Sequence, residues 1–328
     1  MSENNRLSLV SQFQESGKIG AKEQIADKKI FSQAHFDTLW LKNPEKFDPN
    51  HTGYGKERIK RIVDLIKNRL DLSDKEIVDL GCGNGTLTRM LVQGNNRVTG
   101  VDVSENALKN FRIKGCESIT LIRDYIPRSL LPDDHYDLVV AADLIAHIDS
   151  KEYRLFMSEI ARIVKSDGFV VLSTSIDIES ENALQKFIGL VSTEFDILDA
   201  VESHHFLLIK FLNFFKAPEK FVKGEQNPAY RKQALEKRFS FGKVWYKINS
   251  SRPGAFFWSL ITPLTKYPVR LLERNRGLML FLEKCSKFLY DERGVSHIII
   301  LGKRRPLFIP VPETQRPEEM KHKKMLWE

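Results

Sequence analysis

Residues 77–85 read Ile-Val-Asp-Leu-Gly-Cys-Gly-Asn-Gly, a short apolar run followed by three glycines at alternate positions. The apolar run predicts a β-strand, and the glycines predict a tight turn in which the backbone comes close to a ligand. Helical spacing begins directly after the turn, at Leu87, Met90 and Leu91. A strand, a glycine-rich turn and a helix in this order are typical of ligand-binding loops in parallel α/β sheets.

Apolar segments alternate with helical patterns along most of the chain. Helical spacing is clear over 59–70 and again over 149–164. This rhythm predicts an α/β fold, a doubly wound, Rossmann-like sheet of seven strands with helices on both faces. The predicted strands are 77–80, 97–101, 119–122, 136–142, 169–173, 195–200 and 297–302.

The glycine turn differs from a dinucleotide-binding turn in two respects. Its spacing is Gly81-x-Gly83-x-Gly85, whereas dinucleotide sites use G-x-G-x-x-G. In addition, Asp79 stands two residues before the first glycine, where a carboxylate would repel a pyrophosphate. S-adenosylmethionine has no phosphate and carries a sulfonium and an ammonium, so a nearby carboxylate suits it.

Two more acids follow predicted strands. Asp102 ends the second strand, where a carboxylate can accept hydrogen bonds from both ribose hydroxyls of a nucleoside. Asp124 ends the third strand, within reach of an adenine amino group, with Tyr125 placed beside the base. Each acid alone could be an ordinary loop residue. Three acids at successive carboxyl ends favour a ligand site, because open parallel sheets bind ligands at that edge.

Several segments resemble the class I S-adenosylmethionine-dependent methyltransferases. Residues 77–85 resemble their first motif, 101–104 the acidic strand after it, and 137–148 their fourth strand. The resemblance covers roughly residues 58–202, and 297–304 is similar to their last, antiparallel strand. It implies S-adenosylmethionine as cofactor, with contacts from the following residues: Asp79, Gly81, Gly83, Asp102, Val103, Asp124, Tyr125 and Ala142.

Within this class, the segment after the fourth strand resembles small-molecule enzymes such as those of quinone biosynthesis. Those enzymes read Glu-Val-Leu-Glu-His-Val where this chain has Asp-Leu-Ile-Ala-His-Ile at 143–148. Ala146 replaces the second glutamate, so we predict no metal site there. An Asn-Pro-Pro-Tyr motif and a Pro-Cys nucleophile are both missing from the catalytic region, which argues against methylation of DNA bases.

His147 is the candidate general base, since an imidazole titrates near neutral pH. The alternative is a histidine that only lines the cofactor pocket. His135 and the pair His204-His205 are lesser candidates and are interpreted as loop histidines. Trp40 and Tyr54 precede the sheet where this class often has a lid, although a core or surface position is the simpler interpretation.

The alternation stops after residue 204. Residues 205–293 are predicted to form a helical insertion with 18 Lys/Arg against 7 Asp/Glu and 11 of the 21 Phe residues. Three interpretations stay open: a substrate cap over the pocket, a membrane-surface element, or an RNA-binding face. Glycines and prolines are expected to break its helices at Pro218, Gly224, Pro228, Pro253, Pro263 and Pro268.

The predicted organisation is a flexible arm over 1–30, a methyltransferase domain over 31–204 and 294–305, the insertion, and a flexible tail over 306–328. With 42% hydrophobic residues the chain can bury a sizeable core. No secretion signal is recognised, and the longest charge-free stretch of the insertion, 253–265, is shorter than the ~20 residues that cross a bilayer.

Three cysteines, Cys82, Cys116 and Cys285, lack metal-type spacing and leave one unpaired in any disulfide scheme. This indicates a cytoplasmic protein, with peripheral membrane contact through the insertion as an option. The predicted function is methyl transfer from S-adenosylmethionine to an oxygen or nitrogen of a small or lipid-like metabolite. The alternatives are an RNA or protein acceptor, with nucleic acid less favoured, or a cofactor-binding scaffold without turnover.

Overall fold

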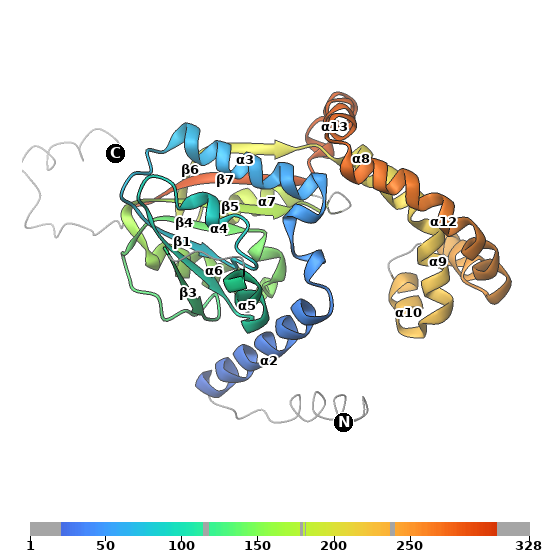
Figure 1. Cartoon of the computed structure of the whole chain (residues 1–328), viewed down its shortest axis with the longest axis horizontal. Helices are drawn as coiled ribbons and strands as arrows, with labels where there is room; N and C mark the ends of the chain where they lie inside the picture. Colours follow the sequence, from blue (N-terminus) through green and yellow to red (C-terminus); the bar gives the residue numbers. More distant parts are fainter. Residues whose placement is uncertain (1–20, 114–117, 178–179, 181, 237–239, 307–328) are drawn as a thin grey trace, which may run out of the picture.

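The computed structural model describes residues 21–113, 118–177, 180, 182–236 and 240–306 (Figure 1). A seven-stranded sheet with the order β3-β2-β1-β4-β5-β7-β6 forms its centre. Neighbouring strands are parallel except β7, which runs antiparallel to β5 and β6. The strands are β1 (Glu76–Leu80), β2 (Arg97–Asp102), β3 (Ile119–Arg123), β4 (Tyr136–Ala142), β5 (Val164–Ser175), β6 (Phe195–Ser203) and β7 (His297–Arg304).

Helices cover both faces of the sheet, and the alternation of side chains along each strand divides the core into two layers. In β7, Ile298 and Ile300 face one layer, while Ile299 and Leu301 face the other. The first layer packs against α6 (Tyr153–Ile163) and α7 (Ala183–Val191). The second packs against α3 (Gly53–Arg69), α4 (Thr88–Leu91) and α5 (Glu105–Ile113). The predicted sheet, with its antiparallel last strand, is therefore confirmed.

Two boundaries differ from the sequence predictions. Helix α2 (Ala21–Lys42) includes residues 21–30, which we expected in a flexible arm. Its first half is rich in Ala, Lys, Glu and Gln, residues with high helix propensity but no apolar periodicity. Strand β5 begins at Val164 and not at residue 169, because Val164 already pairs with Tyr136 before a register shift. The expected arm over 1–20 and tail over 307–328 lie outside the described residues.

The insertion between β6 and β7 is helical, as expected, and extends away from the sheet (Figure 1). It is anchored where both guanidinium Nη atoms of Arg61 in α3 bind the Glu283 carboxylate, at 2.7 and 2.6 Å. An apolar cluster with Leu208 and Met279 lies at the base. The helices are α8 (Phe206–Phe215), α9 (Ala217–Gln226), α10 (Pro228–Glu236), α11 (Ser240–Asn249), α12 (Arg252–Arg274) and α13 (Arg276–Tyr290).

Three of the six expected helix breaks are wrong. Pro263 and Pro268 lie inside the 23-residue helix α12, and Gly224 lies inside α9. Pro218, Pro228 and Pro253 do stand at helix N-termini, where the missing N–H has no intrahelical partner to lose. In the part of the chain that the structure describes, no helix is long and apolar enough to cross a membrane.

The glycine turn generates a stability prediction. Gly85 has φ +75°, and a Cβ there would lie 2.4–2.5 Å from three ring atoms of Phe111, a ring that also packs against the Arg89 guanidinium, 4.4 Å from its centre. We expect Gly85→Ala to lower the free energy of unfolding by about 2–4 kcal/mol, the sum of backbone strain and overpacking. Urea denaturation measures this loss.

Gly189→Ala is the matched control. Gly189 is exposed in helix α7, and no atom lies within 4 Å of an added Cβ. Alanine there should raise stability by about 0.5–1 kcal/mol. Equal effects at the two positions would contradict the packing assigned to Gly85.

Candidate functional site

The turn after β1 has glycines in the left-handed region, with φ +73°, +54° and +75° at Gly81, Gly83 and Gly85. Residues with a Cβ rarely adopt these backbone dihedral angles, so the conformation of the turn requires glycine. The buried ring of Trp40, from α2, covers the turn, since a Cβ on Gly83 would lie 2.9 Å from its Cζ2 atom. Trp40 is therefore part of the site's wall.

Asp102 connects this turn to the end of β2. The Gly83 N–H donates to Oδ2 of Asp102 at 2.9 Å, and the Ser104 N–H donates to Oδ1 at 2.8 Å. Ser104 in turn caps α5 by accepting a hydrogen bond from the Ala107 N–H at 3.2 Å. Burial raises the pKa of Asp102 to about 6, although these backbone donors act in the opposite direction.

Asp79 is more deeply buried, at 2% exposed. Its Oδ2 accepts a hydrogen bond from the Thr88 hydroxyl at 2.6 Å. Burial raises its pKa to about 7, and the neighbouring Asp102 adds to the rise. Among the described residues, neither carboxylate forms an ion pair with a basic side chain. Two buried acids without a basic partner among the described residues therefore lie near the turn.

Asp124 stabilises the loop that follows β3. Its oxygens accept hydrogen bonds from the backbone N–H groups of Tyr125 and Leu130, at 2.8 and 2.7 Å. The carboxylate thereby folds the segment after β3 back on itself. A contact between Asp124 and adenine stays a prediction.

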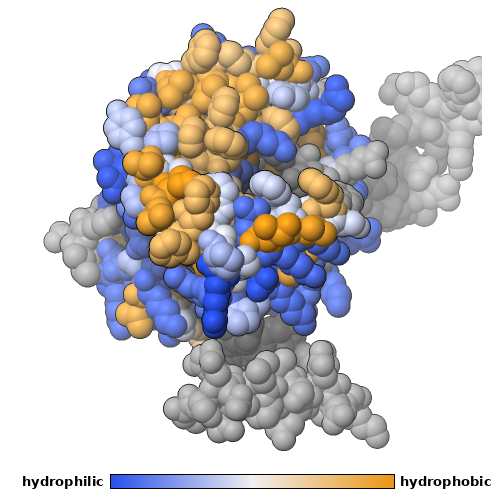
Figure 2. Space-filling view, turned by 90° about the vertical axis from the view of Figure 1, so that its right-hand side faces the viewer, coloured by the Kyte–Doolittle hydropathy of each residue, from blue (hydrophilic) through white to orange (hydrophobic). Residues whose placement is uncertain are grey.

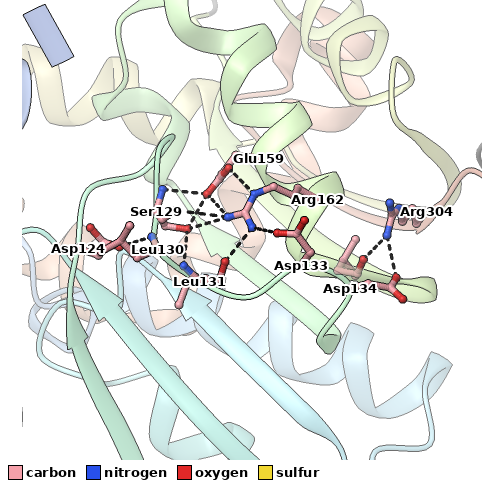
Figure 3. Close-up of polar contacts among 10 residues, drawn as sticks. Asp124, Ser129, Leu130, Leu131, Asp133, Asp134, Glu159, Arg162 and Arg304 are labelled. Atoms are coloured by element: carbon pink, nitrogen blue, oxygen red, sulfur yellow. Dashed lines mark hydrogen bonds and ion pairs between the residues drawn. The ribbon is translucent and has the colours of Figure 1, made fainter. Parts of the chain in front are cut away.

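The same segment is held from the other side by α6 (Figure 3). Arg162 donates to both oxygens of Glu159, at 3.0 and 2.8 Å, and to the carbonyl of Leu131 at 2.8 Å. Glu159 also accepts from the N–H of Ser129 at 2.9 Å. These bonds hold the segment that carries Asp124 and Tyr125, so the wall beside them is rigid.

A cavity of about 1650 Å³ opens at this edge of the sheet. Small-molecule sites usually measure roughly 300–1,000 Å³, so the space exceeds what one ligand needs. Aromatic side chains form much of its wall, among them Phe36, Phe47 and Tyr54. The predicted site residues that line it are Asp79, Gly81, Gly83, Asp102, Val103, Asp124, Tyr125, Ala142 and His147, together with Trp40 and Tyr54.

The insertion does not supply this lining. No residue of 205–293 is among those that border the cavity within the described part of the chain. Its outer wall comes instead from residues 32–59, which include the end of α2 and the start of α3. The insertion is joined to α3 through Arg61 and Glu283, and its role as a substrate cap stays a prediction.

His147 lies in the turn after β4 and is exposed to the cavity. Its ring meets Phe36 edge-on, with ring centres 5.6 Å apart. Partial burial lowers the pKa of His147, while the charge of Asp143 acts in the opposite direction. The imidazole is therefore neutral at pH 7 and able to accept a proton.

A polar network beside His147 was not anticipated from the sequence. Asp143, with φ +57°, pairs through Oδ2 with Nη1 of Arg58 and through Oδ1 with Nε2 of His297, both at 2.8 Å. Burial alone would raise the pKa of Asp143, but the His297 hydrogen bond and the Arg58 charge outweigh it and hold that pKa below its usual value. Burial raises the pKa of Tyr54, which lies under Arg58, to about 12.

This network joins α3, β4 and β7 at the cavity. One signal was available in the sequence: a last strand that runs antiparallel begins at the edge where the parallel strands end. His297, its first residue, therefore lies at the same edge of the sheet as Asp143, but this signal does not indicate that the two residues pair. Arg58 carried no comparable signal.

The other histidines lie elsewhere. His204 and His205 are buried beyond the end of β6 rather than in an open loop, and burial lowers the pKa of His205 to about 4. His135 is exposed beside Tyr136. None of the three borders the cavity. Within the described ranges, no three His, Cys, Asp or Glu side chains converge on a potential metal position.

The residues at the cavity suit a cationic nucleoside ligand. Asp79 and Asp102 are carboxylates that burial destabilises in their charged form, and a positive ligand group beside them would relieve this cost. The left-handed glycines leave room for such a ligand to approach the backbone. S-adenosylmethionine has this chemistry.

The raised pKa of Asp79 predicts that cofactor binding depends on pH. A cation next to Asp79 lowers its pKa, so binding at pH 7 should release about half a proton, and affinity should rise from pH 6 to 8. Calorimetry in buffers of different ionisation enthalpy measures the released protons.

Asp79→Asn should reduce this proton release to the smaller share of Asp102. Asp64→Asn, which changes a surface acid paired with Lys60, is the control and should leave it unchanged. The assignment fails if Asp79→Asn releases as many protons as the unchanged protein.

Known proteins that resemble this chain are methyltransferases. A family profile described as "Methyltransferase domain" matches residues 77–168. A ubiquinone biosynthesis O-methyltransferase of Idiomarina loihiensis is 30% identical over 180 residues, which cover 53% of this chain and 69% of the relative. The corresponding enzyme of Nitrosomonas europaea is 30% identical over 139 residues, covering 41% and 57%. Against several such relatives the chain spans about half of their length, for example 47% in Hydrogenovibrio crunogenus.

The N-methyltransferase NodS of Bradyrhizobium japonicum, solved with S-adenosyl-l-homocysteine, is 16% identical and has a TM-score of 0.44. The match covers 52% of this chain and 90% of that one. The strand order, the glycine turn with its acids and the sequence relatives lead to one conclusion. The chain belongs to the class I S-adenosylmethionine-dependent methyltransferases.

Proposed function

We propose that this protein transfers a methyl group from S-adenosylmethionine to an oxygen or nitrogen of a small or lipid-like metabolite. The observation that carries the proposal is the cavity, in which the glycine turn, the two buried acids and His147 border one space of about 1650 Å³. Such a space accommodates an acceptor beside the cofactor.

The walls favour an acceptor with an apolar or aromatic body. Phe36, Phe47 and Tyr54 offer ring surfaces, and such rings contribute large apolar contact areas. The polar groups of Arg58 and His147 also border the cavity and can orient a hydroxyl or amine. The relatives from Idiomarina and Nitrosomonas are named for a reaction on oxygen, which supports this class of acceptor without deciding between oxygen and nitrogen.

The cofactor, when bound, supplies the electrophilic methyl group. Neutral His147 can take the proton of the acceptor's hydroxyl or amine, because its lowered pKa leaves the ring nitrogen unprotonated at pH 7. The aromatic wall around it excludes water and restricts the acceptor to few orientations. The residues of this chain thus position the acceptor and remove its proton.

His147→Asn tests the proposal. We expect turnover to fall by roughly 10²–10⁴-fold, while calorimetry shows nearly unchanged cofactor affinity. His135→Asn is the matched control, because this exposed histidine lies outside the cavity. Methyl transfer from labelled cofactor is followed with small-molecule, lipid, RNA and protein fractions as acceptors.

The pH profile provides a second readout. At saturating cofactor, turnover should fall at acid pH with a midpoint below the ordinary imidazole pKa of about 6.5, because protonated His147 cannot accept a proton. The Asn variant should lose this acid limb. Transfer to RNA or protein alone would overturn the acceptor class, and tight cofactor binding without any transfer would indicate a scaffold.

A further inference from the structure

Helix α11 exposes its apolar stripe. Phe241, Val244, Trp245 and Ile248 follow the i, i+3, i+4, i+7 spacing of one helical face, yet they are between 55% and 82% exposed. In a surface helix this face normally packs against the core. Here a row of large apolar side chains lies open on the outside of the insertion.

Helix α12 also exposes a row of apolar side chains, and this row is longer. Phe256, Leu260, Leu264 and Tyr267 recur at intervals of three or four residues and are 62–74% exposed. Figure 2 views the molecule from the side of the insertion and shows hydrophobic residues gathered in broad areas on that face. We call the outer sides of α11 and α12 the insertion face.

The insertion face is the outer side of packed helices. On the inner side of α11, Tyr246 is 1% exposed, and its hydroxyl donates to the Lys220 carbonyl of α9 at 3.1 Å. Trp258 of α12 donates from Nε1 to Oδ1 of Asn249 at 2.7 Å, which links the two helices. Each helix therefore has its inner contacts already, and the outer stripes are left without a neighbour among the described residues.

Positive charge surrounds these stripes. Residues 240–274 contain six Lys/Arg, of which Lys243 and Lys247 are exposed on α11 and Arg252 forms an ion pair with Glu225 of α9 at 3.9 Å. The single acid, Glu273, is paired with Lys216 of α8 at 2.6 Å. Exposed aromatic and aliphatic residues bordered by unopposed lysines are the composition of helices that lie at an anionic lipid surface.

We propose that the insertion face docks on an anionic membrane surface. The apolar side chains of α11 and α12 enter the region between headgroups and acyl chains, and the lysines and arginines contact the anionic headgroups. This surface lies outside the cavity, so the proposal goes beyond the proposed function and does not depend on it.

The charge and the side-chain types of the insertion face disfavour two other binding partners. A second copy of the chain on this face would bring two sets of six cations together with a single acid on each side. RNA would satisfy the cations, but Val244, Ile248, Leu260 and Leu264 are aliphatic and cannot stack on bases. An anionic bilayer is the partner that satisfies both the aliphatic side chains and the cations.

Vesicle flotation with the full-length protein tests the proposal. Binding is expected to vesicles of 30% phosphatidylglycerol in phosphatidylcholine, to weaken in high salt, and to be lost with phosphatidylcholine alone. Trp245→Ser with Ile248→Ser should lower the partition coefficient by more than about tenfold. Lys243→Ser with Lys247→Ser should lower it about twenty-five-fold, roughly fivefold for each lysine.

The control variant is Leu130→Ser with Leu198→Ser, which removes two leucines, 91% and 53% exposed, that lie outside the insertion. It should float as the unchanged protein does. Cofactor calorimetry on every variant shows that the fold is intact.

Three results would overturn the proposal: no flotation of the unchanged protein, equal losses in the insertion and control variants, or flotation that does not depend on anionic lipid. Sedimentation showing a dimer that Trp245→Ser with Ile248→Ser dissociates would assign the face to a second copy instead. A salt-sensitive RNA complex lost in the same variant would assign it to RNA.

Discussion

The carboxylate of Asp102 holds the turn on which the candidate site is built. It accepts one hydrogen bond from Gly83 inside the glycine turn and one from Ser104 at the start of α5. Through these two bonds the end of β2 determines where the loop after β1 can lie. The rings of Trp40 and Phe111 pack against this turn, at Gly83 and Gly85. Because the same carboxylate borders the cavity, the architecture of the turn and its ability to bind a cation depend on one side chain.

A second polar group organises the acceptor side. Asp143 has an unfavourable backbone conformation for a residue with a side chain, and its ion pair with Arg58 and hydrogen bond with His297 offset that strain. The network ties α3, β4 and β7 together next to His147. The quinone-biosynthesis enzymes that this segment resembles have a second acid where this chain has Ala146. The remaining acid, Asp143, is paired with the guanidinium of Arg58.

Opposite charges are separated in this molecule. Buried carboxylates without basic partners border the cavity, whereas the exposed lysines and arginines of 240–274 surround an apolar face at the far end of the insertion. The separation is physically reasonable, because buried acids favour a cationic cofactor and exposed cations favour anionic headgroups. If both proposals hold, the protein would act on an acceptor close to the lipid surface.

The sequence by itself determined the sheet, the glycine turn and the residues around the cavity. Hydrophobic period, glycine spacing and acids at strand ends are local signals, and they identified all seven strands as well as Asp79, Asp102 and His147. Only the tertiary structure decided the wall contributed by α2, the pairing of Asp143 with Arg58 and His297, and the position of the insertion away from the cavity. These depend on contacts between residues far apart in the chain, such as Asp143 and His297, which are 154 positions apart. The exposure of the apolar stripes on α11 and α12 could not be predicted from the sequence either. An amphipathic helix has the same sequence pattern whether its apolar face is buried or exposed to solvent.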